Sequence, residues 1–192
     1  VISKFAETLV NSKTTPDSFS ACEFHYSDKS DVELLVNYVF VLDSFNFCFW
    51  QSKYSYAHLA EFLKKALISN PQLFRFAEIC KWNSQTMESI FPQDFPLLDE
   101  RLHSILNLAI SVQNESLDFV SLIKSCEKSG AKLAQKISQL GISFQDHSIY
   151  KGRQVYFYKR AQILVADLWG AFEGQDCGQF HDINQLTCFA DY

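Results

Sequence analysis

Apolar residues recur at helical spacing along most of the chain. Between residues 54 and 70, one face of a helix would carry Leu59, Phe62, Leu63, Ala66 and Leu67. Similar spacing predicts further helices over residues 71–80, 84–91, 96–112, 115–129, 131–140 and 156–172, and a short helix over 183–190 that Asp182 caps. Residues 152–158 alone favour an extended segment. The pattern predicts a mainly α fold with at most a small β element.

A further helix is expected to begin near Asp31, where Ser30 and Glu33 have the spacing of a capping box. If this helix continues to Trp50, one face presents Asp43, Asn46, Phe47 and Trp50. The carboxylate of Asp43 could accept two hydrogen bonds from a guanine-like edge, and the rings could stack on a flat base. The alternative is a core helix in which Asp43 is an exposed or paired acid and Asn46 is a buried bridge.

The predicted helix over residues 156–172 carries three charged side chains beside its apolar stripe. Arg160 and Asp167 are two turns apart and share a face, which is most simply explained by an ion pair. Lys159 points elsewhere and lies near the helix N-terminus, where a cation and backbone N–H groups favour a phosphate. Lys151 and Arg153 are close upstream, and a solvated loop is the alternative for this basic cluster.

Asp191 follows an apolar run and is flanked by Phe189 and Tyr192 near the end of the chain. A partly desolvated carboxylate of this kind can stabilise an oxocarbenium-like sugar or orient a water molecule. A surface position is the ordinary alternative for a single aspartate there.

Composition narrows the class of protein. The 192 residues carry a formal net charge of −5, which argues against a protein that follows a nucleic-acid backbone but permits a small anionic ligand. We expect one helical domain over residues 1–192, no direct nucleic-acid polymer and no membrane as partners, and neither a cofactor nor a metal. The six cysteines have no metal-site or disulfide spacing and indicate reduced thiols in the cytoplasm, with the nucleus as an alternative compartment.

Four segments together resemble the queuosine salvage proteins, which are queuosine 5′-phosphate N-glycosylases (hydrolases). In chain order these segments are LDSFNFCFW, PLLDERL, YKGRQVYFYKRAQILVADLWGAF and FHDINQLTCFADY. The resemblance covers residues 39–192, and residues 1–30 carry little of it. It implies a mainly helical fold similar to DNA glycosylases. It also implies hydrolysis of queuosine 5′-monophosphate to queuine and ribose 5-phosphate, so that both the nucleotide and queuine are expected partners.

The resemblance aligns Asp191 with the family's catalytic carboxylate and Lys159 with its phosphate-binding lysine. Substrate-binding roles are also expected for Asp43, Asn46, Phe47, Trp50, Arg160, Asp167 and Tyr192. The family's chains continue past FADY, so this chain is expected to be the N-terminal and central part of a longer one. Two other functions stay open, which are a glycosylase for damaged DNA bases and an inactive helical module that binds a nucleotide or a protein.

Overall fold

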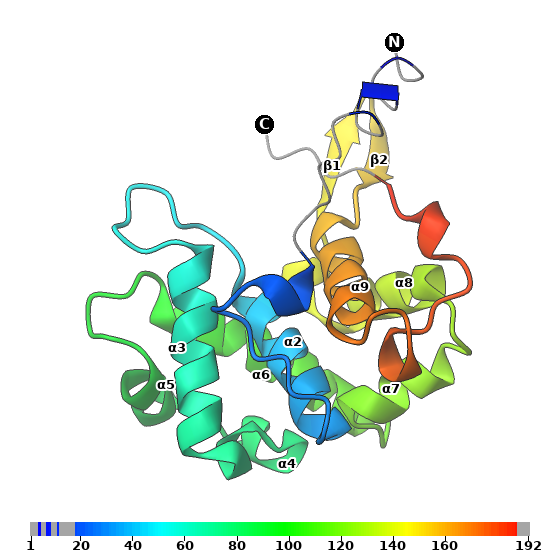
Figure 1. Ribbon diagram of the computed structural model, residues 1–192. Coiled ribbons are helices and arrows are strands. Elements are labelled where there is room, and N and C mark those ends of the chain that lie inside the picture. The colour runs from blue at the N-terminus through cyan, green and yellow to red at the C-terminus, as the bar shows by residue number, and fades with distance from the viewer. Residues whose placement is uncertain (1–3, 5–6, 9–10, 12–17, 188–192) are drawn as a thin grey trace.

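The computed structural model describes residues 4, 7, 8, 11 and 18–187. Helices dominate this part of the chain, so the prediction of a mainly α fold is confirmed (Figure 1). The helices are α2 (Val32–Phe45), α3 (Tyr56–Ser69), α4 (Phe76–Ile79), α5 (Ser84–Ile90), α6 (Leu98–Asn114), α7 (Phe119–Ser125), α8 (Gly130–Leu140) and α9 (Lys159–Ala171). The strands are β1 (His147–Tyr150) and β2 (Arg153–Tyr156).

Helix α2 is the centre of the fold. It packs against α3, α6, α7 and α9, and Figure 1 shows it lying between α3 and α9. Every residue from Leu34 to Phe45 is buried, which explains why apolar residues lie on all sides of this stretch rather than along one stripe. A central helix of this kind brings its own C-terminal end close to the elements that surround it.

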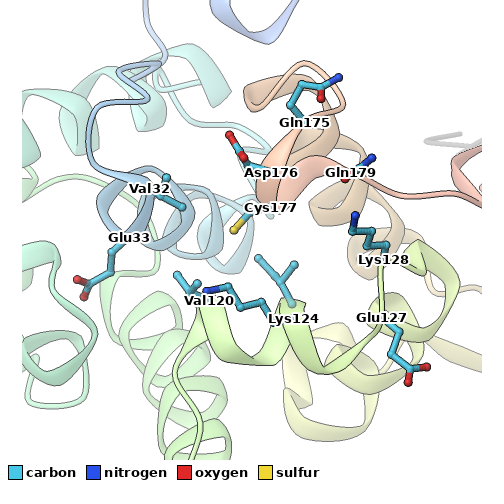
Figure 2. Close-up of a pocket in the computed structure, with 11 residues that line it drawn as sticks. Val32, Glu33, Val120, Lys124, Glu127, Lys128, Gln175, Asp176, Cys177 and Gln179 are labelled. Carbon is cyan, nitrogen blue, oxygen red and sulfur yellow. The ribbon is translucent and has the colours of Figure 1, made fainter.

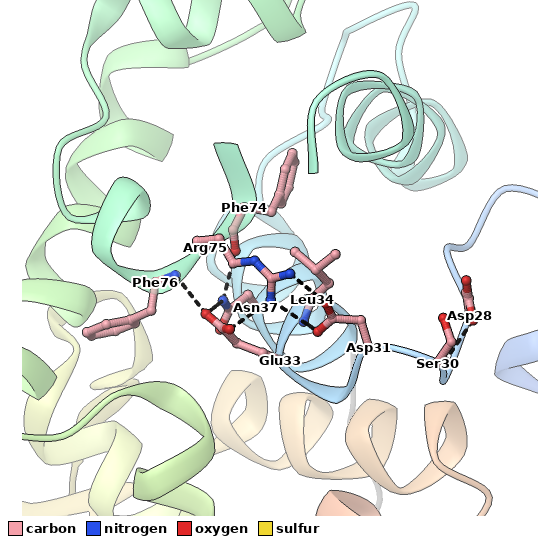
Figure 3. Close-up of polar contacts among 9 residues, drawn as sticks. All are labelled: Asp28, Ser30, Asp31, Glu33, Leu34, Asn37, Phe74, Arg75 and Phe76. Carbon is pink, nitrogen blue, oxygen red and sulfur yellow. Dashed lines mark hydrogen bonds and ion pairs between the residues drawn. The ribbon is translucent and has the colours of Figure 1, made fainter. Parts of the chain in front are cut away.

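The N-terminus of α2 differs by one residue from the prediction. Asp31, not Ser30, caps the helix, and its side chain accepts a hydrogen bond of 3.2 Å from the Leu34 N–H. Glu33 does not complete a capping box, because it pairs with Arg75 at 2.7 Å, while Asp31 binds the same guanidinium at 2.6 Å (Figure 3). The start of α2 is thereby tied to the short segment that follows α3.

The C-terminus of α2 corrects a second prediction. The helix ends at Phe45 instead of continuing to Trp50, and residues 46–50 form a loop in which Cys48 has a left-handed φ of 52°. The last carbonyl groups of a helix lack intrahelical donors. Here two arginines supply donors, since Arg160 donates to the Asp43 and Ser44 carbonyls and Arg101 donates to the Phe45 carbonyl.

The extended segment predicted over residues 152–158 is confirmed as strand β2. It pairs with β1 in an antiparallel hairpin, with His147 opposite Tyr156 and Tyr150 opposite Arg153. The turn residues Lys151 and Gly152 have φ values of 49° and 74°, as a type I′ turn requires. The hairpin leads directly into α9, which packs on α2 and α8.

Asp182 caps a helix, but not the predicted one. Its buried carboxylate accepts hydrogen bonds of 2.6 Å from both the Ser129 hydroxyl and the Gly130 N–H, and so caps α8. A Cβ atom at Gly130 would lie 2.9 Å from a methyl group of Val165, so the close approach of α8 to α9 requires glycine here. Of the helix predicted over residues 183–190, the structure describes one short 3₁₀ turn, η5 (Ile183–Gln185).

Candidate functional site

A hollow of about 750 Å³ lies between the loop after α2 and the start of α9. We call it the cationic hollow, because Lys159 and Arg160 line it. Its other lining residues are Asn46, Phe47, Cys48, Phe49, Trp50, Gln51, Asp146 and Ile163. Five residues predicted to bind substrate are therefore brought together, although a loop presents three of them rather than a helical face.

A second hollow, of about 800 Å³, adjoins the first. We call it the aromatic hollow, because rings from several segments line it: Phe19, Phe24, His25, Tyr56 and Trp169. Asn46 and Ile163 line both hollows, and Asp167 lines only the aromatic one. Since Lys159 and Asp167 are eight residues apart on α9, the two hollows follow that helix over about 12 Å.

The N-terminus of α9 fits the predicted phosphate site only in part. Lys159 lines the cationic hollow, but its backbone N–H donates a 2.6 Å hydrogen bond to the Asp146 carboxylate. One first-turn amide is therefore already engaged, and by a negative charge that opposes an anion. Lys151 and Arg153 lie on the hairpin, are exposed and do not line this hollow.

The predicted ion pair between Arg160 and Asp167 is wrong. Arg160 instead donates to three carbonyl groups, at 2.6 Å to Ser143, 2.8 Å to Asp43 and 2.9 Å to Ser44. Burial lowers the pKa of Arg160 to about 10, although the charge of Asp43 favours the guanidinium. Two of these carbonyls, those of Asp43 and Ser44, lie at the C-terminal end of α2 and have no helical donors, so they accept the N–H groups of Arg160.

Arg101 is a structural residue that sequence reasoning missed. It is 0% exposed, and burial lowers its pKa to about 10. Its guanidinium donates to the Phe45 and Pro96 carbonyls and lies 4.6 Å from the centre of the Phe47 ring. The Phe47 ring is also 4.9 Å from Arg160, so two cations hold it in place. Its only sequence signal was a cation inside the PLLDERL motif.

Two carboxyl groups meet at the wall of the aromatic hollow. Asp43 is 1% exposed, and among the described residues neither of its oxygens accepts a hydrogen bond from an N–H or hydroxyl donor. Its carboxyl interacts with that of Asp167, which lines the hollow and also interacts with Tyr56. Asp43 therefore does not present its carboxyl directly to the hollow, contrary to the predicted helical face.

The pKa values of both carboxyl groups are raised. For Asp43 the cause is burial and then the charge of Asp167, partly offset by Arg160. For Asp167 burial raises the pKa to about 6, against interactions with Asp43 and Tyr56 that favour the ionised form. The Tyr56 hydroxyl also lies 3.0 Å from Nε2 of His25, whose Nδ1 is 2.8 Å from the Phe19 carbonyl. The two carboxyl groups can share a proton at the end of this polar chain.

Asp191 and Tyr192, the predicted catalytic residue and its neighbour, lie outside the described residues. Within the described part of the chain, no group of three or more His, Cys, Asp or Glu residues is placed to hold a metal ion. No helix in that part is both long and apolar enough to cross a bilayer.

Figure 2 shows a third hollow, of about 760 Å³, beside α7 and the η4 turn (Asp176–Gly178). Lys124, Lys128 and Cys177 line it, together with acidic and amide side chains. None of the predicted site residues that the structure describes lies there, so the candidate site is the pair of hollows along α9.

The fold and these hollows define a mainly helical protein with two adjoining hollows along α9, one lined by cations and one by aromatic rings. Residues 24–192 match the family described as queuosine salvage protein, and the chain belongs to that family.

Several curated relatives bear the name queuosine 5′-phosphate N-glycosylase/hydrolase. The Dictyostelium discoideum protein is 41% identical over 178 residues, which cover 88% of this chain and 56% of the relative. The Sphaerobacter thermophilus protein is 38% identical over 206 residues, covering 100% of this chain and 62% of the relative. The Mus musculus protein is 32% identical over 180 residues, covering 83% and 53%. The chain thus spans little more than half the length of these relatives.

Proposed function

We propose that the protein hydrolyses the N-glycosidic bond of queuosine 5′-monophosphate and so releases queuine for salvage into tRNA modification. The bond broken joins ribose C1′ to N9 of the 7-deazaguanine base, and the other product is ribose 5-phosphate. The observation that supports this reaction best is the junction of a cationic and an aromatic hollow along α9. The names of the relatives agree with it.

In this proposal the nucleotide lies along α9. The flat base occupies the aromatic hollow, where rings can stack on it and Asn46 can bond its edge. The 5′-phosphate extends to Lys159 in the cationic hollow. The separation of about 12 Å between Lys159 and Asp167 along the helix is comparable with the length of a nucleoside monophosphate.

Asp191 is proposed as the catalytic carboxylate. A 7-deazapurine has carbon in place of N7, so the usual protonation of that nitrogen cannot activate the leaving group. Charge stabilisation at the sugar then matters more, and a carboxylate near C1′ supplies it as the oxocarbenium character develops. The same proposal includes substrate contacts by six further residues: Asn46, Phe47, Trp50, Arg160, Asp167 and Tyr192. The reaction needs neither a metal nor a cofactor.

The test is incubation of the full-length protein with queuosine 5′-monophosphate, with release of queuine followed by chromatography. Asp191→Asn should abolish release while calorimetry still detects substrate binding. Near-normal turnover by the folded variant would refute the assignment of Asp191.

Lys159→Ala tests the phosphate contact. It should reduce the preference for the nucleotide over unphosphorylated queuosine about ten- to a hundredfold in kcat/KM, since a charge-assisted contact contributes about 1.5–3 kcal/mol. The matched control is Lys151→Ala on the exposed hairpin turn, which should leave the preference unchanged. Equal losses with nucleotide and nucleoside in Lys159→Ala would assign Lys159 a structural role.

The two other functions predict different results. A DNA-repair glycosylase would bind duplex DNA and release damaged bases from it, and an inactive binding module would bind without releasing queuine. We expect no stable DNA complex at moderate salt, because the net charge is −5. The five described cysteines are free thiols, which agrees with the cytoplasm as the proposed compartment.

A further inference from the structure

Asp43 and Asp167, the acid pair at the wall of the aromatic hollow, form no ion pair among the described residues that would explain their burial. Asp43 on α2 is 1% exposed, and its two oxygens lack hydrogen-bond donors among the described residues. Isolated buried carboxylates are strongly unfavourable, and pairs of them ordinarily retain a proton. Arg160 is the cation whose charge acts on Asp43, but its two terminal nitrogens donate to carbonyls and not to either carboxyl group.

The pair is also connected to the cavity. Asp167 lines the aromatic hollow, while Asp43 does not line it and interacts with Asp167. A proton that the pair holds is therefore available on the side where a ligand would bind. This arrangement differs from a buried structural pair, which would be enclosed on all sides.

We infer that Asp167, which shares a proton with Asp43, is the acid that protonates the departing base. The inference rests on the proposed function and adds a second catalytic residue to it. Asp43 is a positioning residue, because it acts through Asp167 and does not line the cavity.

The step balances with water as the only co-reactant. The C1′–N9 bond breaks, and its electron pair goes to the base, which takes the proton from Asp167. Water adds its oxygen to C1′, and the proton that it loses restores the protonated pair. Since a 7-deazapurine has no N7 to protonate, its departure as an anion would be slow. A general acid contributes about 10²- to 10⁴-fold to steps of this kind.

The charged and titratable groups around the pair set the pH range of the effect. Arg160 on α9 favours the ionised form of Asp43, whereas Tyr38 on α2 is buried, Tyr56 on α3 is half-buried, and both are neutral because their pKa values are raised. His25 meets the pair through Tyr56, and burial lowers its pKa although the bond to the Phe19 carbonyl opposes this. Burial is the largest effect on both groups: it raises the pKa of Asp43 and raises the pKa of Asp167 to about 6.

The experiment compares two substrates of the full-length protein. One is queuosine 5′-monophosphate, and the other is 4-nitrophenyl riboside 5′-phosphate, whose leaving group needs no proton. Asp167→Asn should lower kcat for the first about a hundredfold or more and leave kcat for the second within a few fold of wild type. Asp99→Asn, which removes an exposed carboxylate on α6, is the control and should change neither rate.

The pH dependence gives a second readout that uses only the natural substrate. The wild-type kcat should fall tenfold per pH unit on the alkaline side, and this fall should disappear in Asp167→Asn. In Asp43→Asn the new amide can donate to Asp167 and favours its ionised form, so the fall should begin at lower pH. If Asp43 and Asp167 had only a structural role, their substitution would not shift the alkaline limb of the pH profile of kcat.

Each of these measurements can overturn part of the inference. Equal losses on both substrates in Asp167→Asn, or unchanged rates on both, would overturn the inference while the proposed function stands. An alkaline limb that keeps its position in Asp43→Asn would overturn the role of Asp43. If the wild-type protein hydrolyses neither substrate, the proposed function fails first and the inference fails with it.

Discussion

Replacing Asp167 by asparagine should stabilise the protein at neutral pH, whatever reaction it catalyses. The carboxyl group of Asp167 has a pKa raised from 3.8 to about 6, chiefly by burial. Between these two values the folded protein binds a proton that the unfolded chain has released. The stability of the wild-type protein therefore falls as the pH rises through this window, and the free-energy difference is constant above it.

The magnitude follows from the shift. One pKa unit corresponds to about 1.4 kcal/mol, so a shift of about two units destabilises the folded state by about 3 kcal/mol above pH 6. Asparagine has a similar shape and carries no charge at any pH. The variant should thus gain about 3 kcal/mol over the wild-type protein between about pH 4 and pH 7. Asp43 adds to this gain, because the variant removes its charged neighbour.

Urea denaturation at several pH values measures the effect. With a typical slope of about 2–3 kcal/mol per molar, the midpoint difference should grow by about 1 M from pH 4 to pH 7. His25 also titrates in this range, but it is present in both proteins and its contribution cancels in the difference. A difference that does not change with pH would show that Asp167 ionises normally, and the description of the pair would be wrong.

Three further predictions concern residues that organise the site. Arg160→Ala should lower the melting temperature by several degrees, because three carbonyl groups lose a charged donor, whereas Arg153→Ala on the exposed hairpin should not. Arg101→Met should lower the free energy of unfolding by about 3 kcal/mol, measured by urea denaturation. It should also raise the rate of hydrogen exchange in the loop after α2, and an unchanged exchange rate would contradict the role given to Arg101. Asp182→Ala should cost about 1–2 kcal/mol at neutral pH. Although burial opposes it, hydrogen bonding lowers the pKa of Asp182, so this loss should shrink as the pH falls below about 4, and a constant loss would refute the capping role.

The helices could be predicted from sequence because their apolar spacing reports burial directly. Most of the predicted helices overlap the observed ones, and the extended segment became β2. The end of α2 could not be predicted in this way. Phe47 and Phe49 are apolar and continue the pattern, but the helix stops where Arg101 and Arg160 reach its carbonyls from α6 and α9. Such long-range donors have no local signal.

The sequence predicted which residues would lie together in part of the candidate site, but not their geometry. Lys159, Arg160, Asn46, Phe47 and Trp50 do line one hollow. The pairing of Asp43 with Asp167 was not foreseen, because it depends on how α2 crosses α9. The aromatic hollow was also missed, since its rings come from segments that are far apart in the sequence and show no motif.

The way in which Arg101 holds the loop after α2 has a consequence for how specificity can evolve. Arg101 binds that region largely through main-chain carbonyls, so the path of the loop does not depend on most of its side chains. Side chains of this loop that do not contact Arg101 can then change with less effect on its course. A scaffold that fixes the backbone and leaves side chains replaceable allows ligand preference to drift, or to be redesigned, without a matching loss of stability.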